Sequence, residues 1–334
     1  MHLFARSTVL RLLFLRFAIV VMGAQRTMST CKLTNVPGFF AQDLPETDPK
    51  TFDYIKSNFG LLEEFPVECD ELWEKDATPV PRWDRFKHAL AAMNRDASKH
   101  TSYRVLFLAR HGQGFHNVAE VYYGTELWNS YWSKLDGNGT IVWADAKLTD
   151  QGIQEAENAN AAWKSQLALG MPLPQSFYSS PLQRASNTLE ITWSGITLDK
   201  GAPDPTIKEK LRETLGVHTC DRRSSKTYLH ETFPEFEFEE GFTENDKLWV
   251  ADVRESNAER TVRLGETLRE ILENDQSTYI TISAHGGSIT SILEVIGHRK
   301  FAMNTGEVIP VVVKVEYCTV EVGNEVYKSC CVKV

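Results

Sequence analysis

The sequence predicts an α/β protein with a three-layer α/β/α architecture, in which helices cover both faces of a mostly parallel central sheet. Three short strand candidates carry this prediction, an apolar run at residues 105–108 and stretches at residues 175–179 and 278–283. Each has the length of a buried strand and is followed by a cationic or imidazole side chain and then by a helical pattern. Such alternation is typical of parallel sheets, because each crossover returns the chain to the same edge.

The first 27 residues are excluded from this fold. They hold four arginines and no acidic residue, and an apolar run from Leu10 to Ala24 that Arg16 interrupts. The run is too short to predict a stable membrane span. Three interpretations stay open: a cytoplasmic protein translated from Met28, which the sequence favours, a mitochondrial presequence, or a secretory signal. In each case we expect residues 1–27 to be a targeting-like segment that is dispensable for folding and catalysis.

Prolines punctuate residues 28–82, so this stretch is predicted to be an N-terminal extension packed on the surface of a domain that spans residues 83–334. Short helices are expected near residues 49–58 and 68–75. Residues 83–97 place apolar side chains at three- and four-residue spacing, which predicts an amphipathic helix whose stripe faces the core.

Residues 118–146 form an insertion rich in aromatic side chains, shortly after the first predicted strand. Two interpretations stay open. The aromatic residues pack on the surface of a long insertion, or they form the wall or lid of a pocket, because a loop that leaves a catalytic strand passes the mouth of the site. They are Tyr122, Tyr123, Trp128, Tyr131, Trp132 and Trp143.

The remaining elements continue the alternation of strands and helices. A helix that starts at Thr149 or Asp150 is predicted to continue to Leu169. Residues 231–244 are strongly acidic and contain four phenylalanines, and we expect a solvated connection with aromatic anchors rather than a metal site. The other predicted helices span residues 182–193, 257–273 and 288–297, and the last predicted strands lie near residues 308–320 and 325–333.

Charge and cysteine spacing limit the function classes. The net charge of -9 at pH 7 argues against nucleic acid as a partner. An acidic protein that binds an anion must concentrate positive potential locally, in a pocket. The six cysteines show neither C-x-x-C pairs nor zinc spacing with histidines, so we expect free thiols and no metal site.

Three predicted strand ends supply groups suited to phosphoryl chemistry. Carboxyl ends of parallel strands lie at one edge of a sheet, so Arg110-His111, Arg184 and His285 are expected to form one anion pocket. An arginine can hold an anion with two parallel hydrogen bonds, and an imidazole nitrogen can take up a phosphoryl group. Gly112 allows the backbone to turn tightly beside a ligand.

Five motifs occur in order over residues 104–286. They are Arg110-His111-Gly112 with Asn117, Leu148-Thr149-x-x-Gly152, Ser180-Pro-Leu-x-Arg184-Ala185-x-x-Thr188, Leu211-Arg-Glu213, and His285-Gly286. In these motifs the sequence resembles the histidine phosphatase superfamily, in its phosphoglycerate mutase-like branch. The resemblance implies the fold of that family, no cofactor, and a small phosphorylated metabolite as the partner.

The same resemblance implies a role for each motif residue. His111 forms a phosphohistidine, Arg110 and Arg184 neutralise the phosphate, and His285 donates to it. Glu213 matches the general acid of the family, which also activates water in the second half-reaction.

Further residues are expected near the substrate, with alternatives left open. Gly112 lies beside the phosphate, and Asn117 either orients the phosphate or caps a helix. Arg222 and Arg223 follow closely on Glu213, and they either meet a second acidic group on the substrate or form a surface pair.

Two departures from the mutase pattern favour a metal-independent phosphomonoester hydrolase. The mutase-type continuation Glu-Ser-x-Trp-Asn is replaced by Gln113-Gly-Phe-His-Asn117, and Leu-Asn-Glu-Arg-His-Tyr-Gly is replaced by Leu211-Arg-Glu-Thr-Leu-Gly216. Both stretches look like those of eukaryotic phosphoglycerate mutase-like proteins. The alternatives are a phosphoryl-transfer mutase and a non-catalytic protein that binds a phosphorylated ligand on the same fold.

Overall fold

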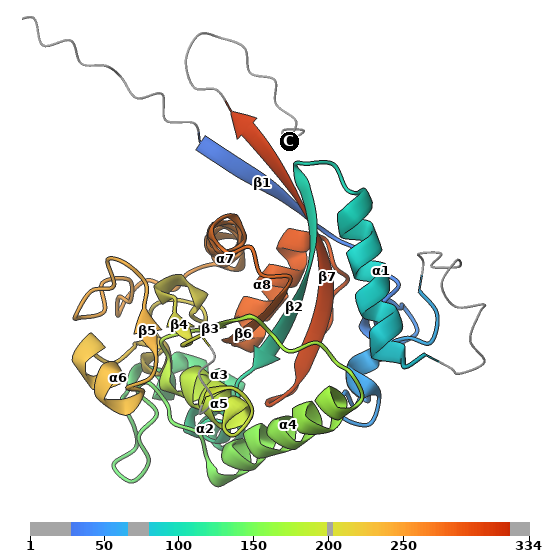
Figure 1. Ribbon diagram of the computed structural model, residues 1–334. Helices are drawn as coiled ribbons and strands as arrows, with labels where there is room; N and C mark the ends of the chain where they lie inside the picture. Colours follow the sequence, from blue (N-terminus) through green and yellow to red (C-terminus); the bar gives the residue numbers. More distant parts are fainter. Residues whose placement is uncertain (1–27, 66–79, 199–202, 321–334) are drawn as a thin grey trace, which may run out of the picture.

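The computed structural model describes residues 28–65, 80–198 and 203–320, and its centre is a seven-stranded sheet in the order β1-β7-β2-β6-β3-β4-β5 (Figure 1). The pairings β2–β6, β6–β3, β3–β4 and β4–β5 are parallel, whereas β7 is antiparallel to both β1 and β2. The prediction of a mostly parallel sheet is therefore confirmed. The strands are β1 (Met28–Asn35), β2 (Thr101–Arg110), β3 (Ser176–Ser179), β4 (Thr206–Ile207), β5 (Glu237–Phe238), β6 (Tyr279–Ala284) and β7 (Val308–Val320).

Helices cover both faces of this sheet, which confirms the three layers. Alternate residues of β2 point to opposite faces. Val105 and Phe107 pack with α1, α4 and α5, whereas Leu106 and Leu108 pack with α7 and α8. The helices are α1 (Arg82–Asp96), α2 (Phe115–Tyr123), α3 (Thr125–Ser130), α4 (Asp150–Ala168), α5 (Gln183–Trp193), α6 (Lys226–Thr232), α7 (Asn257–Asn274) and α8 (Gly286–Ile296).

The helices predicted from residue 83 onward are present within two residues of their expected bounds, because apolar spacing and caps mark them. Thr149 accepts a hydrogen bond from the Gly152 N–H at the start of α4, and Ser256 caps α7 in the same way. The predicted helix at 68–75 and the strand at 325–333 lie outside the described residues.

Residues 28–65 are not a surface extension, so that prediction is wrong. Strand β1 pairs with β7 along its whole length and forms one edge of the sheet. Phe39, Phe40 and Phe59 are almost completely buried, and they pack with Phe86 of α1 in the main core. No α-helix forms at 49–58, where the chain makes turns before a short 3-10 helix at Asn58–Gly60. The aromatic side chains hold this proline-rich stretch in place of regular hydrogen bonding.

The aromatic insertion has a small core of its own. Trp128 and Trp143 are buried, and they pack with Ala119 and with Cys220 from a distant loop. Tyr122 and Tyr131 instead lie exposed. Most of the aromatic residues therefore stabilise the insertion itself, which corresponds to the packing interpretation. If the insertion forms the wall of a pocket, other side chains of the insertion form that wall.

The acidic stretch 231–244 is more ordered than expected. Residues Glu237–Phe238 form the edge strand β5, which pairs in parallel with β4. The expected aromatic anchors are present, because Phe233, Phe236 and Phe242 are buried. The solvated part of the prediction is confirmed as well, because most other side chains of this stretch are exposed, although two of its residues join the edge of the sheet.

Two cysteines can be placed in the described part of the chain. Cys31 and Cys220 are free thiols and both are buried. Within the described ranges we find no helix with the length and apolarity that crossing a bilayer requires.

Candidate active site

The carboxyl ends of β2, β6 and β3 bring the predicted catalytic groups together. Arg110 is the last residue of β2 and pairs in register with Ala284, the last residue of β6. The ring of His111 lies 5.1 Å from that of His285, measured between centroids. From the start of α5, the Nε of Arg184 lies 3.2 Å from the Nε2 of His111. The structure therefore brings the residues of the expected anion pocket together at one edge of the sheet.

His111 is held as a neutral imidazole with one defined tautomer. Its Nδ1 lies 2.7 Å from the Gly112 carbonyl oxygen. A carbonyl only accepts, so Nδ1 carries the hydrogen and Nε2 keeps its lone pair. Burial, followed by the charges of Arg184 and Arg110, lowers the pKa of His111 well below its usual value. The Nε2 lone pair accepts a hydrogen bond from the Nε–H of Arg184 at 3.2 Å, so this nitrogen carries no proton at neutral pH.

Arg184 is fixed by partners on the side away from His111. Its Nη1 donates to the Cys220 carbonyl at 2.6 Å, and its Nη2 donates to Asp221 Oδ1 at 3.0 Å. The other carboxylate oxygen of Asp221 accepts from Arg254 at 2.9 Å. Sequence reasoning missed Asp221, although it ends the stretch Gly216–Asp221 that follows Glu213.

Arg110 is the least compensated cation of the site. Its Nη1 donates to the Met303 carbonyl, but within the described ranges it forms no ion pair with a carboxylate. Its buried Nε has no hydrogen-bond partner there. Burial lowers the pKa of this guanidinium. Arg110 is half-buried, and the carboxylates of Glu213, Glu307 and Glu155 act on it without pairing with it, so a bound anion would give it a direct charge partner.

Two further histidines complete the buried surface around His111. The Nε2 of His285 lies 2.8 Å from the Ser180 hydroxyl, whereas its Nδ1 has no partner in the described chain. The ring of His116, which sequence reasoning missed, lies 5.4 Å from that of His111. Burial lowers the pKa of both side chains well below the usual value. A signal for His116 was available, because it occupies the second position of a helix that starts directly after the nucleophile loop.

Glu213 is aimed into the same region by the start of α8. Its Oε2 accepts from the Gly287 N–H at 2.8 Å, and its Oε1 accepts from the Thr214 N–H at 2.9 Å. A Cβ at Gly287 would lie 2.1 Å from Oε1, so only glycine lets the carboxylate approach. The carboxylate is thus held beside the residue pair His285-Gly286.

Gly112 and Asn117 shape the loop after His111. A Cβ at Gly112 would lie 2.3 Å from the Gly152 carbonyl oxygen, so this loop and α4 fit only with glycine at both contacts. The Gly112 N–H donates to Thr188 Oγ1 at 2.9 Å. The Asn117 Oδ1 accepts from the Gly114 N–H at 2.9 Å, which corresponds to the helix-cap alternative for this residue.

Comparison with known families agrees with this geometry. The sequence pattern described as "Histidine phosphatase superfamily (branch 1)" matches residues 130–314, which is more than half of the chain. The chain belongs to the histidine phosphatase superfamily. Phosphoryl transfer of the phosphatase or mutase type is the chemistry of that family.

Fungal relatives support the same assignment over most of the chain. A "Probable phosphoglycerate mutase" of Arthroderma benhamiae is 48% identical over 93% of this chain and 92% of its own length. A "Probable phosphoglycerate mutase" of Saccharomyces cerevisiae is 35% identical over 87% of this chain and 99% of its own. "Phosphomutase-like protein 3" of Candida albicans is 34% identical over 87% of this chain and 82% of its own. These relatives place the chain in the phosphoglycerate mutase-like branch of the superfamily.

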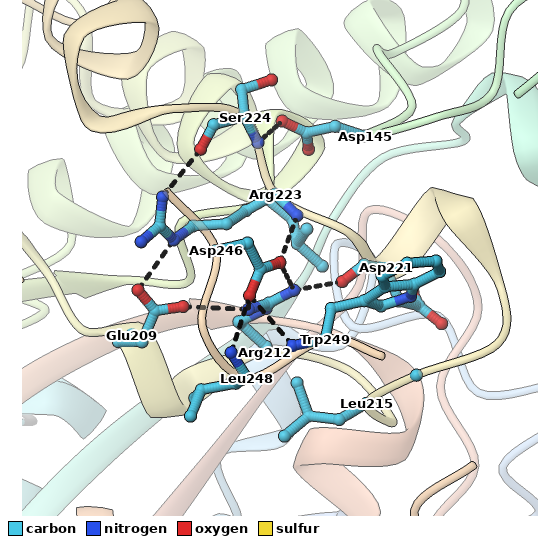
Figure 2. Close-up of polar contacts among 12 residues, drawn as sticks. Asp145, Glu209, Arg212, Leu215, Asp221, Arg223, Ser224, Asp246, Leu248 and Trp249 are labelled. Atoms are coloured by element: carbon cyan, nitrogen blue, oxygen red, sulfur yellow. Dashed lines mark hydrogen bonds and ion pairs between the residues drawn. The ribbon is translucent and has the colours of Figure 1, made fainter. Parts of the chain in front are cut away.

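In this member of the superfamily, the side chains of Arg222 and Arg223 contact other residues of the same chain. Arg222 forms an ion pair with Asp136 at 2.8 Å and lies over the ring of Trp249. Arg223 is buried, and Figure 2 shows it between Glu209 and Ser224. Its remaining N–H groups donate to the backbone and hydroxyl oxygens of Thr243, Glu244 and Asn245. The structure thus does not bring this pair together with His111.

One group of potential metal ligands occurs in the described part of the chain. Atoms of His218, Cys220 and Asp221 lie within 4.8 Å of one another. Both oxygens of the Asp221 carboxylate already pair with arginines, Arg184 and Arg254. A cation at this place would meet two guanidinium groups, so the geometry favours a positioning role for Asp221.

Proposed function

We propose that this protein is a phosphomonoester hydrolase that works through a phosphohistidine at His111. One observation carries the proposal. The Nδ1–H of His111 is committed to the Gly112 carbonyl, so the unprotonated Nε2 accepts a hydrogen bond from the Nε–H of Arg184 at 3.2 Å. A phosphate held by that guanidinium meets the nucleophile at close range.

In the first step Nε2 of His111 attacks phosphorus, and the bond between phosphorus and the ester oxygen breaks. Arg110 and Arg184 neutralise the phosphoryl oxygens, and His285 donates to one of them. The departing oxygen takes a proton from the carboxyl group of Glu213. The products are the free alcohol and phospho-His111.

In the second step the Glu213 carboxylate takes a proton from water as its oxygen attacks the phosphorus of phospho-His111. The Nε2–P bond breaks, inorganic phosphate leaves, and His111 returns to its neutral form. Gly287 and Thr214 orient the carboxylate in both steps. The two arginines supply the positive charge that other phosphatases take from metal ions, so we expect chelators to leave hydrolysis unchanged.

The test is phosphate release from an aryl phosphate by the full chain and by His111→Ala. We expect the variant to lose at least about a thousandfold in kcat, because no other group forms the covalent intermediate. Acid-labile phosphate should appear on the wild-type protein after rapid quenching and be absent from the variant. Full activity in His111→Ala would overturn the proposal. His88→Ala on the exposed side of α1 is the matched control.

A mutase is the second candidate, because the fungal relatives carry mutase names. A mutase keeps the dephosphorylated intermediate and needs further anion-binding residues for it. The test is incubation with a monophosphoglycerate and a bisphosphate primer. Isomer exchange faster than phosphate release would replace the hydrolase proposal with a mutase.

A further inference from the structure

A cavity of about 480 Å³ lies next to the candidate active site, between the aromatic insertion and α6. Two of the residues that line the cavity lie close in sequence to proposed catalytic residues. Gln183 directly precedes Arg184, and Phe115 follows His111 by four residues. The Phe115 N–H donates to the carbonyl of Lys147, a third lining residue, at 3.1 Å. The wall of the cavity is therefore continuous with the loop that carries the nucleophile.

The polar floor of the cavity is already satisfied by the protein. Asp145 Oδ1 accepts from the Gln183 N–H at 3.0 Å. Its Oδ2 accepts from the Ser224 N–H at 2.9 Å, a contact that Figure 2 shows. The Tyr228 hydroxyl donates to Gln183 Oε1 at 3.2 Å. These groups are committed to one another, so the floor fixes the shape of the cavity and offers little hydrogen bonding to a ligand.

The walls are apolar and open to solvent. Phe115 and Tyr228 supply aromatic rings, and Ile141 and Val142 supply aliphatic side chains. Val142 is 66% exposed and Tyr228 is 37% exposed. Apolar side chains left open around a cavity of this size are typical of sites that take a flat hydrophobic group.

Lys147 is the cation of the cavity lining, which also holds the carboxylate of Asp145. It is exposed, and within the described ranges its ammonium forms no ion pair. Asp145, the acidic residue of the lining, is buried and accepts from neutral N–H groups. Since Arg222 and Arg223 are bound to the protein, Lys147 is placed to meet a second anionic group of the substrate.

We propose that this cavity binds the leaving group, and that the preferred substrates are phosphomonoesters of flat, hydrophobic alcohols that carry a second anionic group. The proposal rests on the proposed function, because it names the substrate class of the same site. The phosphate lies at His111, the flat body lies between Phe115, Val142 and Tyr228, and the anion lies at Lys147.

The apolar part is tested with two esters whose leaving alcohols have similar acidity, 2-(2-naphthyl)ethyl phosphate and ethyl phosphate. Wild-type protein should prefer the naphthyl ester in kcat/KM. Phe115→Ala should lower this preference about tenfold, and Val142→Asp should lower it as well. Because Val142 is exposed, Val142→Asp should fold and can be measured even if Phe115→Ala does not fold. Val262→Asp, on the exposed face of α7, is the matched control and should keep the preference.

The charged part is tested with naphthylethyl phosphates that carry a ring carboxylate or the matching carboxamide. Wild-type protein should prefer the carboxylate, and Lys147→Met should lower this preference roughly threefold, as expected for an exposed ion pair. Lys247→Met is the matched control, because Lys247 is also exposed but lines a different cavity. In the wild type, the preference for the carboxylate ester over the carboxamide ester should weaken as the salt concentration rises. In Lys147→Met this preference should not depend on the salt concentration.

The outcomes separate this proposal from the proposed function. Hydrolysis that requires His111, with ester preferences that Phe115→Ala, Val142→Asp and Lys147→Met leave unchanged, overturns the cavity assignment alone. Absence of hydrolysis for every ester overturns the proposed function, and the cavity assignment with it.

Discussion

Two buried clusters in this protein each contain two arginines, and they differ in how the positive charge is balanced. In the loop cluster of Figure 2, Arg212 and Arg223 share Glu209, and Arg212 also pairs with Asp246. In the candidate active site Arg184 pairs with Asp221, but Arg110 forms no ion pair among the described residues. The neighbouring histidines add no further positive charge, because burial keeps them neutral.

The difference separates a structural cluster from a functional one. The charge of a buried arginine that pairs with two carboxylates is balanced, and such an arginine fixes the loops that carry those carboxylates. An arginine without a paired carboxylate, such as the half-buried Arg110, can take an anion as its partner. We therefore propose that the phosphate binds at the unbalanced cluster.

The largest effect is expected for Arg110→Met, which tests whether the unpaired arginine acts in catalysis. We expect kcat/KM for an aryl phosphate to fall about a thousandfold, because the variant removes a cation that faces the developing charge. The melting temperature should change little, since Arg110 is half-buried and forms no ion pair among the described residues that methionine would break. Unchanged activity together with a lower melting temperature would show that Arg110 is a structural residue.

The opposite variant, Arg212→Met, should act mainly on stability. It leaves Glu209 and Asp246 with fewer partners in a buried place, which costs about 3 kcal/mol by analogy with other broken buried pairs. Urea unfolding monitored by tryptophan fluorescence gives the free energy of unfolding. If the variant kept wild-type stability and lost turnover, the loop cluster would belong to the active site.

The sequence predicted the unbalanced cluster better than the balanced one. The strands before His111, Arg184 and His285 are short apolar runs, and parallel strands bring their carboxyl ends to one edge, so local patterns sufficed. Arg223 offered no such pattern. Its partners include carbonyl oxygens of Thr243 and Asn245, whose positions depend on the folded path of the whole loop.

The edge strand β1 was missed for a related reason. Met28 pairs with Val320, so the contact joins opposite ends of the described chain. Pairing at that sequence separation leaves no local trace, and the prolines after residue 35 indicated a loop. The buried phenylalanines at 39, 40 and 59 were the available sign that this stretch belongs to the core.

The neutral histidines make the candidate active site sensitive to acid. Burial lowers the folded-state pKa of His116, and Arg184, His111, Arg110 and His218 act in the same direction. The unfolded chain therefore binds more protons below about pH 6.5, so stability must fall as the pH drops through that range. We expect His116→Phe to reduce the slope by about 1.4 kcal/mol per pH unit.

The measurement is the free energy of unfolding between pH 5 and pH 7. His230→Phe, on the exposed side of α6, is the control for replacing a histidine with phenylalanine at the surface. An unchanged slope in His116→Phe would mean that His116 is already charged in the folded protein, and the electrostatic contrast between the two clusters would be weaker.

The smallest effect is expected at Arg222, which joins neither cluster. Its partner Asp136 is exposed, and an ion pair on the surface contributes less than about 1 kcal/mol. Arg222→Gln keeps polar contact with Asp136 and much of the packing over Trp249, so unfolding and turnover should both stay close to wild type. Steady-state kinetics with the carboxylated naphthyl ester is the decisive measurement, because that ester carries the second anion. A rise in KM larger than the rise caused by Lys147→Met would assign the contact with the second anionic group to Arg222 and not to the cavity. That result would agree with the substrate contact that the sequence suggested for Arg222, which follows closely on Glu213.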